Sequence, residues 1–218
     1  MGRWSVIVVT AAFVVAGRSD PARAEEASPQ LHVRVYDNTQ LPRRQLAAVL
    51  VGASRLLAPV GIEVYWHTCS PAARVSTESV RQPERSASCD EPLARGELAL
   101  RIVHAEMPST YRGRLPLGDS LVDRDLGLGV LATIYYERVE WLAREANVPM
   151  SPLLSRTIAH ELAHLLLGNA EHAASGLMRP AWSRQELRRN RAKDWRFTSA
   201  DADAIRERRK QAAAALVE

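Results

Sequence analysis

The first half of the chain alternates between strand-like and helix-like spacing of apolar residues. Residues 31–36 place apolar and polar side chains in turn, which is typical of a half-buried strand. From residue 42 to residue 57 the apolar positions follow helical spacing, and Pro59 with Gly61 ends that pattern. Residues 62–66 alternate again. A strand, a helix and a strand of these lengths predict a parallel crossover unit.

The second half of the chain predicts two more strands and two more helices. Residues 97–104 and 128–136 have strand patterns, and we interpret the Gly- and Pro-containing segment between them as a loop. A short helix is expected over 139–146. The main apolar helix is expected over 154–167, after two prolines that mark its approach.

The amino terminus has the pattern of an export signal. A basic residue precedes an apolar run over residues 6–16, and residues 22–24 read Ala-Arg-Ala, a small-x-small cleavage pattern. The run is well short of the roughly 20 residues that a spanning helix needs. We therefore expect a signal peptide over 1–24, cleavage near Ala24, export, and no membrane span in the mature chain. Residues 25–218 are expected to form one domain, since a chain of this length with 46% hydrophobic residues is sufficient for one well-buried core.

The two cysteines lie in one polar segment. Residues 68–96 are rich in Ser, Pro, Arg and Glu, and we interpret them as a surface loop. Because an exported protein meets an oxidising compartment, we predict a disulfide between Cys69 and Cys89. Two free thiols or a metal-binding pair are the alternatives, and the absence of a Cys-x-x-Cys spacing disfavours the metal.

The basic residues gather near the carboxyl terminus, in a segment over 184–218 that we expect to be helical. Residues 184–210 hold ten Lys or Arg against five Asp or Glu. Basic runs on a helix are usually a solvated face, and neither interleaved aromatic residues nor a recognition motif accompanies this one. We therefore do not expect nucleic acid as a partner.

One pentapeptide in the main helix has the spacing of a metal-binding motif. His160 and His164 are four residues apart, so both imidazoles lie on one helix face and can bind one ion. Glu161 projects about 100° away from His160, where it can reach a water on the metal instead of the metal itself. This arrangement predicts a zinc site in which Glu161 is the general base.

A catalytic tetrahedral zinc site needs a third protein ligand and one open position. Gly168 can end the helix in a left-handed turn, and His172 follows four residues later. We expect this turn to bring His172 back toward the ion. Glu171 is the competing ligand, because a carboxylate also satisfies zinc.

The sequence around this motif resembles the metzincin zinc peptidases, and most of all their matrixin branch. The resemblance is carried by His-Glu-Leu-Ala-His over 160–164, by His172 and by Gly-Leu-Met-Arg-Pro over 176–180. It implies that Met178 forms a hydrophobic floor beneath the histidines in a Met-containing turn. Residues 197–205 resemble the start of the family's C-terminal helix. In that segment Thr198 and Asp201 have the spacing of a capping box. The implied fold is α/β (α+β), a twisted mixed sheet packed on two long helices, with a C-terminal helix after the Met-turn.

The spacing departs from the family pattern. The family has Gly seven and His ten residues after the first His, whereas Gly168 is eight and His172 twelve residues after His160. The next segment is shorter in compensation, because Met178 comes only six positions after His172. We therefore expect a relocated turn that keeps the third ligand.

The resemblance also implies a substrate. If it holds, the strand over 128–136 borders the cleft as an edge strand, and an extended polypeptide substrate pairs with it. The leading hypothesis is thus an exported zinc metallopeptidase. The alternatives are a non-catalytic zinc-binding interaction domain on the same scaffold and a zinc amidase that acts on a non-protein substrate.

Overall fold

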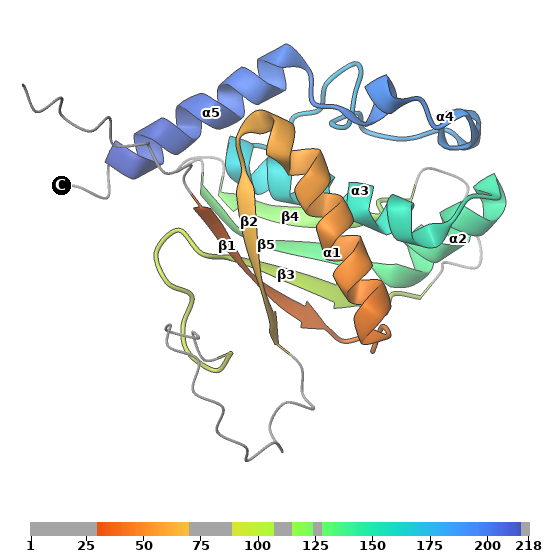
Figure 1. The fold of residues 1–218 in the computed structure, drawn as a ribbon, viewed down its shortest axis with the longest axis horizontal. Coiled ribbons are helices and arrows are strands. Elements are labelled where there is room, and N and C mark those ends of the chain that lie inside the picture. Colours follow the sequence, from red (N-terminus) through yellow and green to blue (C-terminus); the bar gives the residue numbers. More distant parts are fainter. Residues whose placement is uncertain (1–29, 70–88, 107–114, 124–127, 215–218) are drawn as a thin grey trace, which may run out of the picture.

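A computed structural model describes residues 30–69, 89–106, 115–123 and 128–214 (Figure 1). The segment predicted to be a signal peptide lies outside these ranges. No helix within them is both long and apolar enough to cross a membrane. In chain order the elements are β1 (Gln30–Asp37), α1 (Arg43–Leu57), η1 (Ala58–Val60), β2 (Glu63–Cys69), β3 (Leu98–Val103), β4 (Gly118–Asp123), β5 (Leu128–Tyr135), α2 (Tyr136–Ala146), α3 (Met150–Leu167), α4 (Arg184–Arg189), η3 (Ala192–Trp195) and α5 (Ser199–Ala214).

The five strands form one mixed sheet. Its order is β2-β1-β3-β5-β4. The pairs β1–β2, β1–β3 and β3–β5 are parallel, whereas β4 runs antiparallel to β5. The parallel crossover expected for the first half is therefore confirmed, as is the mixed α/β class.

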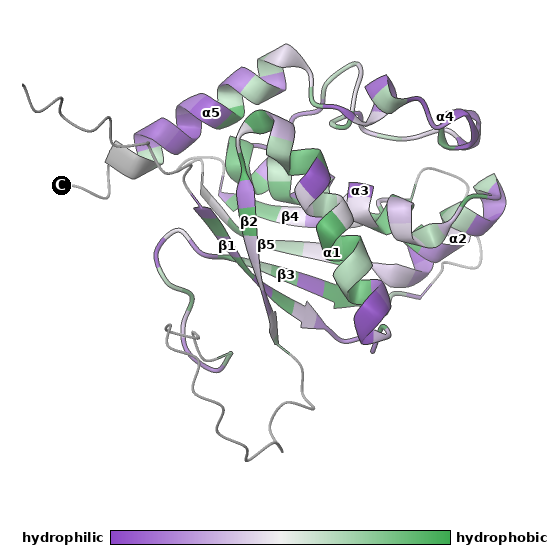
Figure 2. Cartoon of the chain, viewed as in Figure 1, coloured by the Kyte–Doolittle hydropathy of each residue, from purple (hydrophilic) through white to green (hydrophobic). Residues whose placement is uncertain are grey.

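Helices α1 and α3 form the layer that covers one face of the sheet. They contact each other, while α1 contacts β2 and α3 contacts β4 and β5. Alternate strand residues such as Val33, Val35 and Ile134 face this layer and are fully buried. In Figure 2 the strands show much hydrophobic colour, whereas α5 is largely hydrophilic. The core between sheet and helices thus fixes the position of α3.

The position predicted for the edge strand was wrong. Strand β5 lies inside the sheet, between β3 and β4, and the edge strand on that side is β4. Residues 118–123 belong to the Gly- and Pro-containing segment that was interpreted as a loop, and Gly118, Asp119 and Asp123 are residue types depleted in strands. Pairing with β5 supplies the backbone hydrogen bonds that override this weak propensity.

The main helix begins earlier than expected. Helix α3 starts at Met150, with Pro152 in its first turn. A proline is tolerated there because the first backbone N–H groups of a helix have no partner within the helix. The capping box expected farther along is confirmed: Thr198 Oγ1 accepts from Asp201 N at 3.1 Å, and Asp201 Oδ2 accepts from Thr198 N at 3.0 Å.

The face of the sheet away from α1 and α3 is covered in part by the segment that follows Cys89. The predicted Cys69–Cys89 disulfide is confirmed. Beside it, Arg34 of β1 forms a two-pronged ion pair with Glu97, with both N···O distances 2.7 Å. Arg34 also donates to the Glu91 carbonyl at 2.5 Å. Glu97 hydrogen-bonds to Arg34, and this keeps the pKa of the Glu97 carboxyl below its usual range.

Replacing Glu97 by glutamine is expected to lower the free energy of unfolding by about 1.5–3 kcal/mol, the value of hydrogen bonds to a charged group. The guanidinium of Arg34 is only 1% exposed, so it would keep its charge under the loop after losing its ion pair with the Glu97 carboxylate. Chemical denaturation of both proteins measures the difference. A change below about 0.5 kcal/mol, the usual range for surface substitutions, would contradict this role for the pair.

Candidate metal centre

Helix α3 and the loop after it bring three imidazoles together. His160 and His164 lie one turn apart on α3, and His172 lies in the loop. Their ring centroids are 4.7, 4.8 and 5.3 Å apart, and each ring offers a nitrogen within 4.8 Å of the others. His160 and His164 are 8% and 5% exposed, whereas His172 is exposed. Glu171 is not part of this group of potential ligand atoms.

The turn after α3 is what brings His172 back. Gly168 ends the helix with a left-handed φ of 63°, a conformation that costs glycine little. The next residue, Asn169, turns its carbonyl toward the helix and accepts from His164 Nδ1 at 3.1 Å. The two additional residues in the spacing are therefore accommodated while His172 still reaches the group.

Backbone carbonyls fix which nitrogen of each buried imidazole is free. His160 Nδ1 donates to the Leu177 carbonyl at 2.9 Å, and His164 Nδ1 donates to Asn169. A neutral imidazole that donates through Nδ1 keeps a lone pair on Nε2. The two Nε2 atoms are only 3.1 Å apart. Two lone pairs at this distance cannot hydrogen-bond to each other, so the donor set fits a divalent cation such as zinc.

The segment predicted to be a Met-turn contacts the same site. Met178 and Leu177 are fully buried. The Met178 carbonyl accepts from Ala173 N at 2.9 Å, and Leu177 N donates to the Arg196 carbonyl at 2.8 Å. These bonds hold the Leu177 carbonyl that orients His160. Sequence reasoning missed this carbonyl, because a backbone group has no residue signature.

Two tryptophans pack in a column beside His160, and the sequence reasoning missed both. Trp182 lies edge-on to His160 with ring centroids 5.7 Å apart, and Trp195 lies edge-on to Trp182 at 5.6 Å. Arg156 of α3 stacks over Trp195, 3.8 Å from the ring centre. This column leaves the His160 ring little room to turn.

Glu161, the residue after His160 on α3, is a buried carboxylic acid. It is 6% exposed, and burial raises its pKa to about 7. Ser120 of β4 counteracts part of this shift by donating to Glu161 Oε2 at 2.8 Å. A group with a pKa near the working pH is suited to accept and return a proton.

The buried imidazoles are held in the neutral form. Burial lowers the pKa of His160 to about 3, and the neighbouring His164 adds to this effect. The pKa of His164 is lowered to about 4 for the same main reason. The neutral form is the one that binds a metal.

We expect the chelator-treated protein to lose stability as the pH falls from 6.5 toward 4.5. In the unfolded chain His160 and His164 have the ordinary histidine pKa of 6.5, so they bind protons in this pH range, whereas in the folded protein their lowered pKa values keep them neutral. Glu161 acts in the opposite sense, because its raised pKa gives stability that is present below pH 4.5 and lost as the pH rises through about 7. Between pH 6.5 and 4.5 the destabilising effect of the two imidazoles is larger than the stabilising effect of the one carboxyl.

Glu161→Gln removes the opposing contribution and should steepen the loss of stability on acidification. Melting temperatures of both proteins at several pH values between 4.5 and 6.5 measure the two slopes. An equal or shallower slope in the variant would show that burial does not raise the Glu161 pKa.

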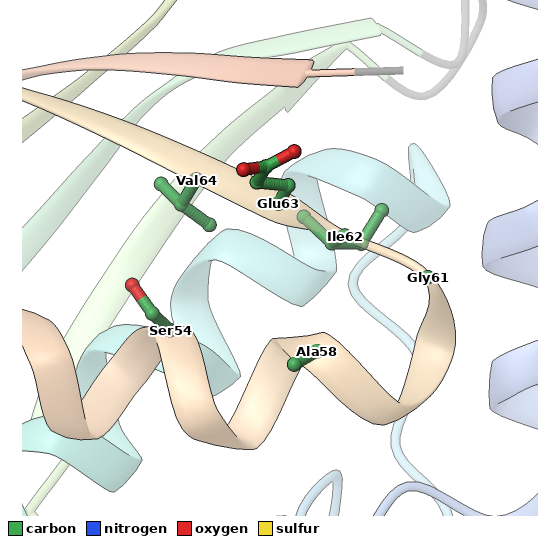
Figure 3. Close-up of a pocket in the computed structure, with 6 residues that line it drawn as sticks. All are labelled: Ser54, Ala58, Gly61, Ile62, Glu63 and Val64. Atoms are coloured by element: carbon green, nitrogen blue, oxygen red, sulfur yellow. The ribbon is translucent and has the colours of Figure 1, made fainter. Parts of the chain in front are cut away.

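The structure has a surface pocket that is separate from the histidine site. It lies between the end of α1 and the start of β2 (Figure 3). Its lining contains no histidine, and its one ionisable residue, Glu63, is exposed. Trp66 Nε1 donates to Ser54 Oγ at 2.8 Å beside it. The lining residues are Ser54, Ala58, Gly61, Ile62, Glu63 and Val64.

Comparison with known proteins places the fold. No protein-family model and no curated protein matches the sequence. Among solved structures, the chain is similar to archaemetzincin from Methanopyrus kandleri. The match has a TM-score of 0.51 and 15% sequence identity, and it covers 86% of this chain and 99% of the other. The fold is therefore archaemetzincin-like, which confirms the predicted metzincin-like architecture.

Proposed function

We propose that this chain is an exported zinc metallopeptidase that uses His160, His164 and His172 as ligands and Glu161 as general base. The observation that carries the proposal is the pair of Nε2 atoms 3.1 Å apart, on a helix that also buries the Glu161 carboxyl. A zinc ion bound there supplies a Lewis acid and lowers the pKa of water. Glu161 accepts the proton of the attacking water and passes it to the leaving amine.

The edge strand β4 supports a polypeptide substrate. No other strand of the described residues pairs with its outer side, so its backbone groups can accept an extended chain by strand addition. Ser120 of this strand donates a hydrogen bond to Glu161, the residue proposed as general base, and this contact supports a substrate bound along the same edge.

The finer parts of the proposal rest on the sequence. Export is inferred from residues 1–24, and the Cys69–Cys89 disulfide suits an oxidising compartment. The matrixin branch and the role of Met178 as a floor are inferred from the Met-containing turn, in which Met178 is fully buried.

The test measures zinc content and hydrolysis on the same full-length preparation. We expect about one zinc per chain, cleavage of a mixed peptide library, loss of cleavage with a chelator, and recovery on addition of zinc. Bound zinc with no cleavage of any peptide would favour the interaction domain. Cleavage of non-protein amides alone would favour the amidase.

A further inference from the structure

Strand β4 presents alternate residues to α3 and to solvent. Gly118, Ser120 and Val122 face the helix side, and Gly118 is buried. The residues between them are exposed, as expected for a strand with one covered face. The helix-facing residues are therefore the ones placed to contact Glu161 directly.

Ser120 is hydrogen-bonded to Glu161 in two ways. Its Oγ lies 2.8 Å from the Glu161 backbone carbonyl and 2.8 Å from the carboxylate Oε2. A hydroxyl has one proton, so it donates to one of these acceptors at a time. The bond to the carboxylate favours one orientation of the Glu161 side chain.

Gly118 makes room for the other side of the same carboxylate. A Cβ added at Gly118 would lie 2.8 Å from Glu161 Cγ and 2.9 Å from Oε1. It would also lie 2.6 Å from the backbone oxygen of Thr133, so the strand could not easily move away. An alanine here would push the Glu161 side chain out of its present position.

From these contacts we propose that Gly118 and Ser120 are positioning residues for Glu161. Ser120 holds one carboxylate oxygen, and Gly118 leaves the space in which the other lies. Both residues belong to the strand that binds substrate in the proposed function. The strand that pairs with the peptide therefore also orients Glu161, the proposed base. The consequence for catalysis rests on that proposed function, whereas the contact itself does not.

A double-mutant cycle on the metal-free protein tests the contact without any activity. Ser120→Ala, Glu161→Ala and the double variant are compared by thermal unfolding. We expect the loss in melting temperature caused by Ser120→Ala to be smaller when Glu161 is already alanine. Equal losses in the two backgrounds would overturn the proposed contact.

Kinetics test the consequence. We expect Ser120→Ala to lower kcat about 10- to 100-fold, the scale of effect for a misplaced catalytic group, while KM and zinc content stay near those of the parent. Ser120→Thr keeps the hydroxyl and should recover most of kcat, whereas Gly118→Ala should lower kcat as well. Ser54→Ala is the matched control, because it removes a serine hydroxyl of α1 that accepts a hydrogen bond from Trp66.

Each outcome decides the proposal. An unchanged kcat in Ser120→Ala, or a loss explained by lower zinc content, would overturn the positioning role. If Ser120→Ala does not fold, Ser120→Cys keeps the size of the side chain with a weaker donor and takes its place in both tests. If the parent protein cleaves nothing, the proposed function fails while the double-mutant cycle still reports on the contact.

Discussion

Glu161→Gln is expected to lower kcat/KM for peptide hydrolysis by about 10²- to 10⁴-fold, the usual contribution of a general acid–base group. The amide keeps the size of the side chain and can still accept a hydrogen bond from Ser120, so the helix and the three imidazoles should stay in place. It cannot accept the proton of the attacking water. The measurements are kcat/KM on one cleaved peptide and zinc content by elemental analysis.

Glu140→Gln on α2 is the control for this variant, because Glu140 is 38% exposed and pairs only loosely with Arg144. It should leave activity and zinc content unchanged. Full activity in Glu161→Gln with zinc bound would remove Glu161 from the mechanism. Loss of zinc from that variant would instead point to Glu161 as a ligand.

His172→Ala is expected to weaken zinc binding by more than about 100-fold. Changing a residue that only supports a metal ligand costs about 10- to 100-fold, and the loss of a ligand should cost more. His160 and His164 would remain, but two imidazoles do not complete the three-ligand set of a catalytic zinc site. Competition with a chromophoric chelator measures the affinity.

Glu171→Ala is the matched control for the third ligand, since the two residues are neighbours in the same loop. Glu171 is exposed and lies outside the imidazole group, so its loss should leave zinc affinity near that of the parent protein. A larger effect of Glu171→Ala than of His172→Ala would assign the third position to the carboxylate.

Much of the architecture could be predicted from local patterns. The period of apolar residues located β1, α1, β2 and β3 within one to three residues, because each element must bury one side against the core. The ends of helices were harder to place. Helix α3 begins four residues before the predicted start, since the first turn of a helix tolerates proline without help from apolar spacing.

The sheet order could not be predicted in the same way. Strand β4 is short and contains Gly118, Asp119 and Asp123, residue types depleted in strands, so its sequence carries little strand signal. Its place outside β5 depends on pairing between residues that the sequence does not mark as partners. The prediction of an edge strand over 128–136 was wrong for this reason.

Features set by local spacing along the chain could be read from the sequence alone. Two imidazoles four residues apart must lie on one face of α3, and a cysteine pair in an exported chain favours a disulfide. Only the tertiary structure decided what surrounds that chemistry. The contact of Ser120 with Glu161 joins residues 41 apart, and the Leu177 carbonyl meets His160 across a turn. Such contacts depend on how the strands and loops pack against α3, and no local period in the sequence records that packing.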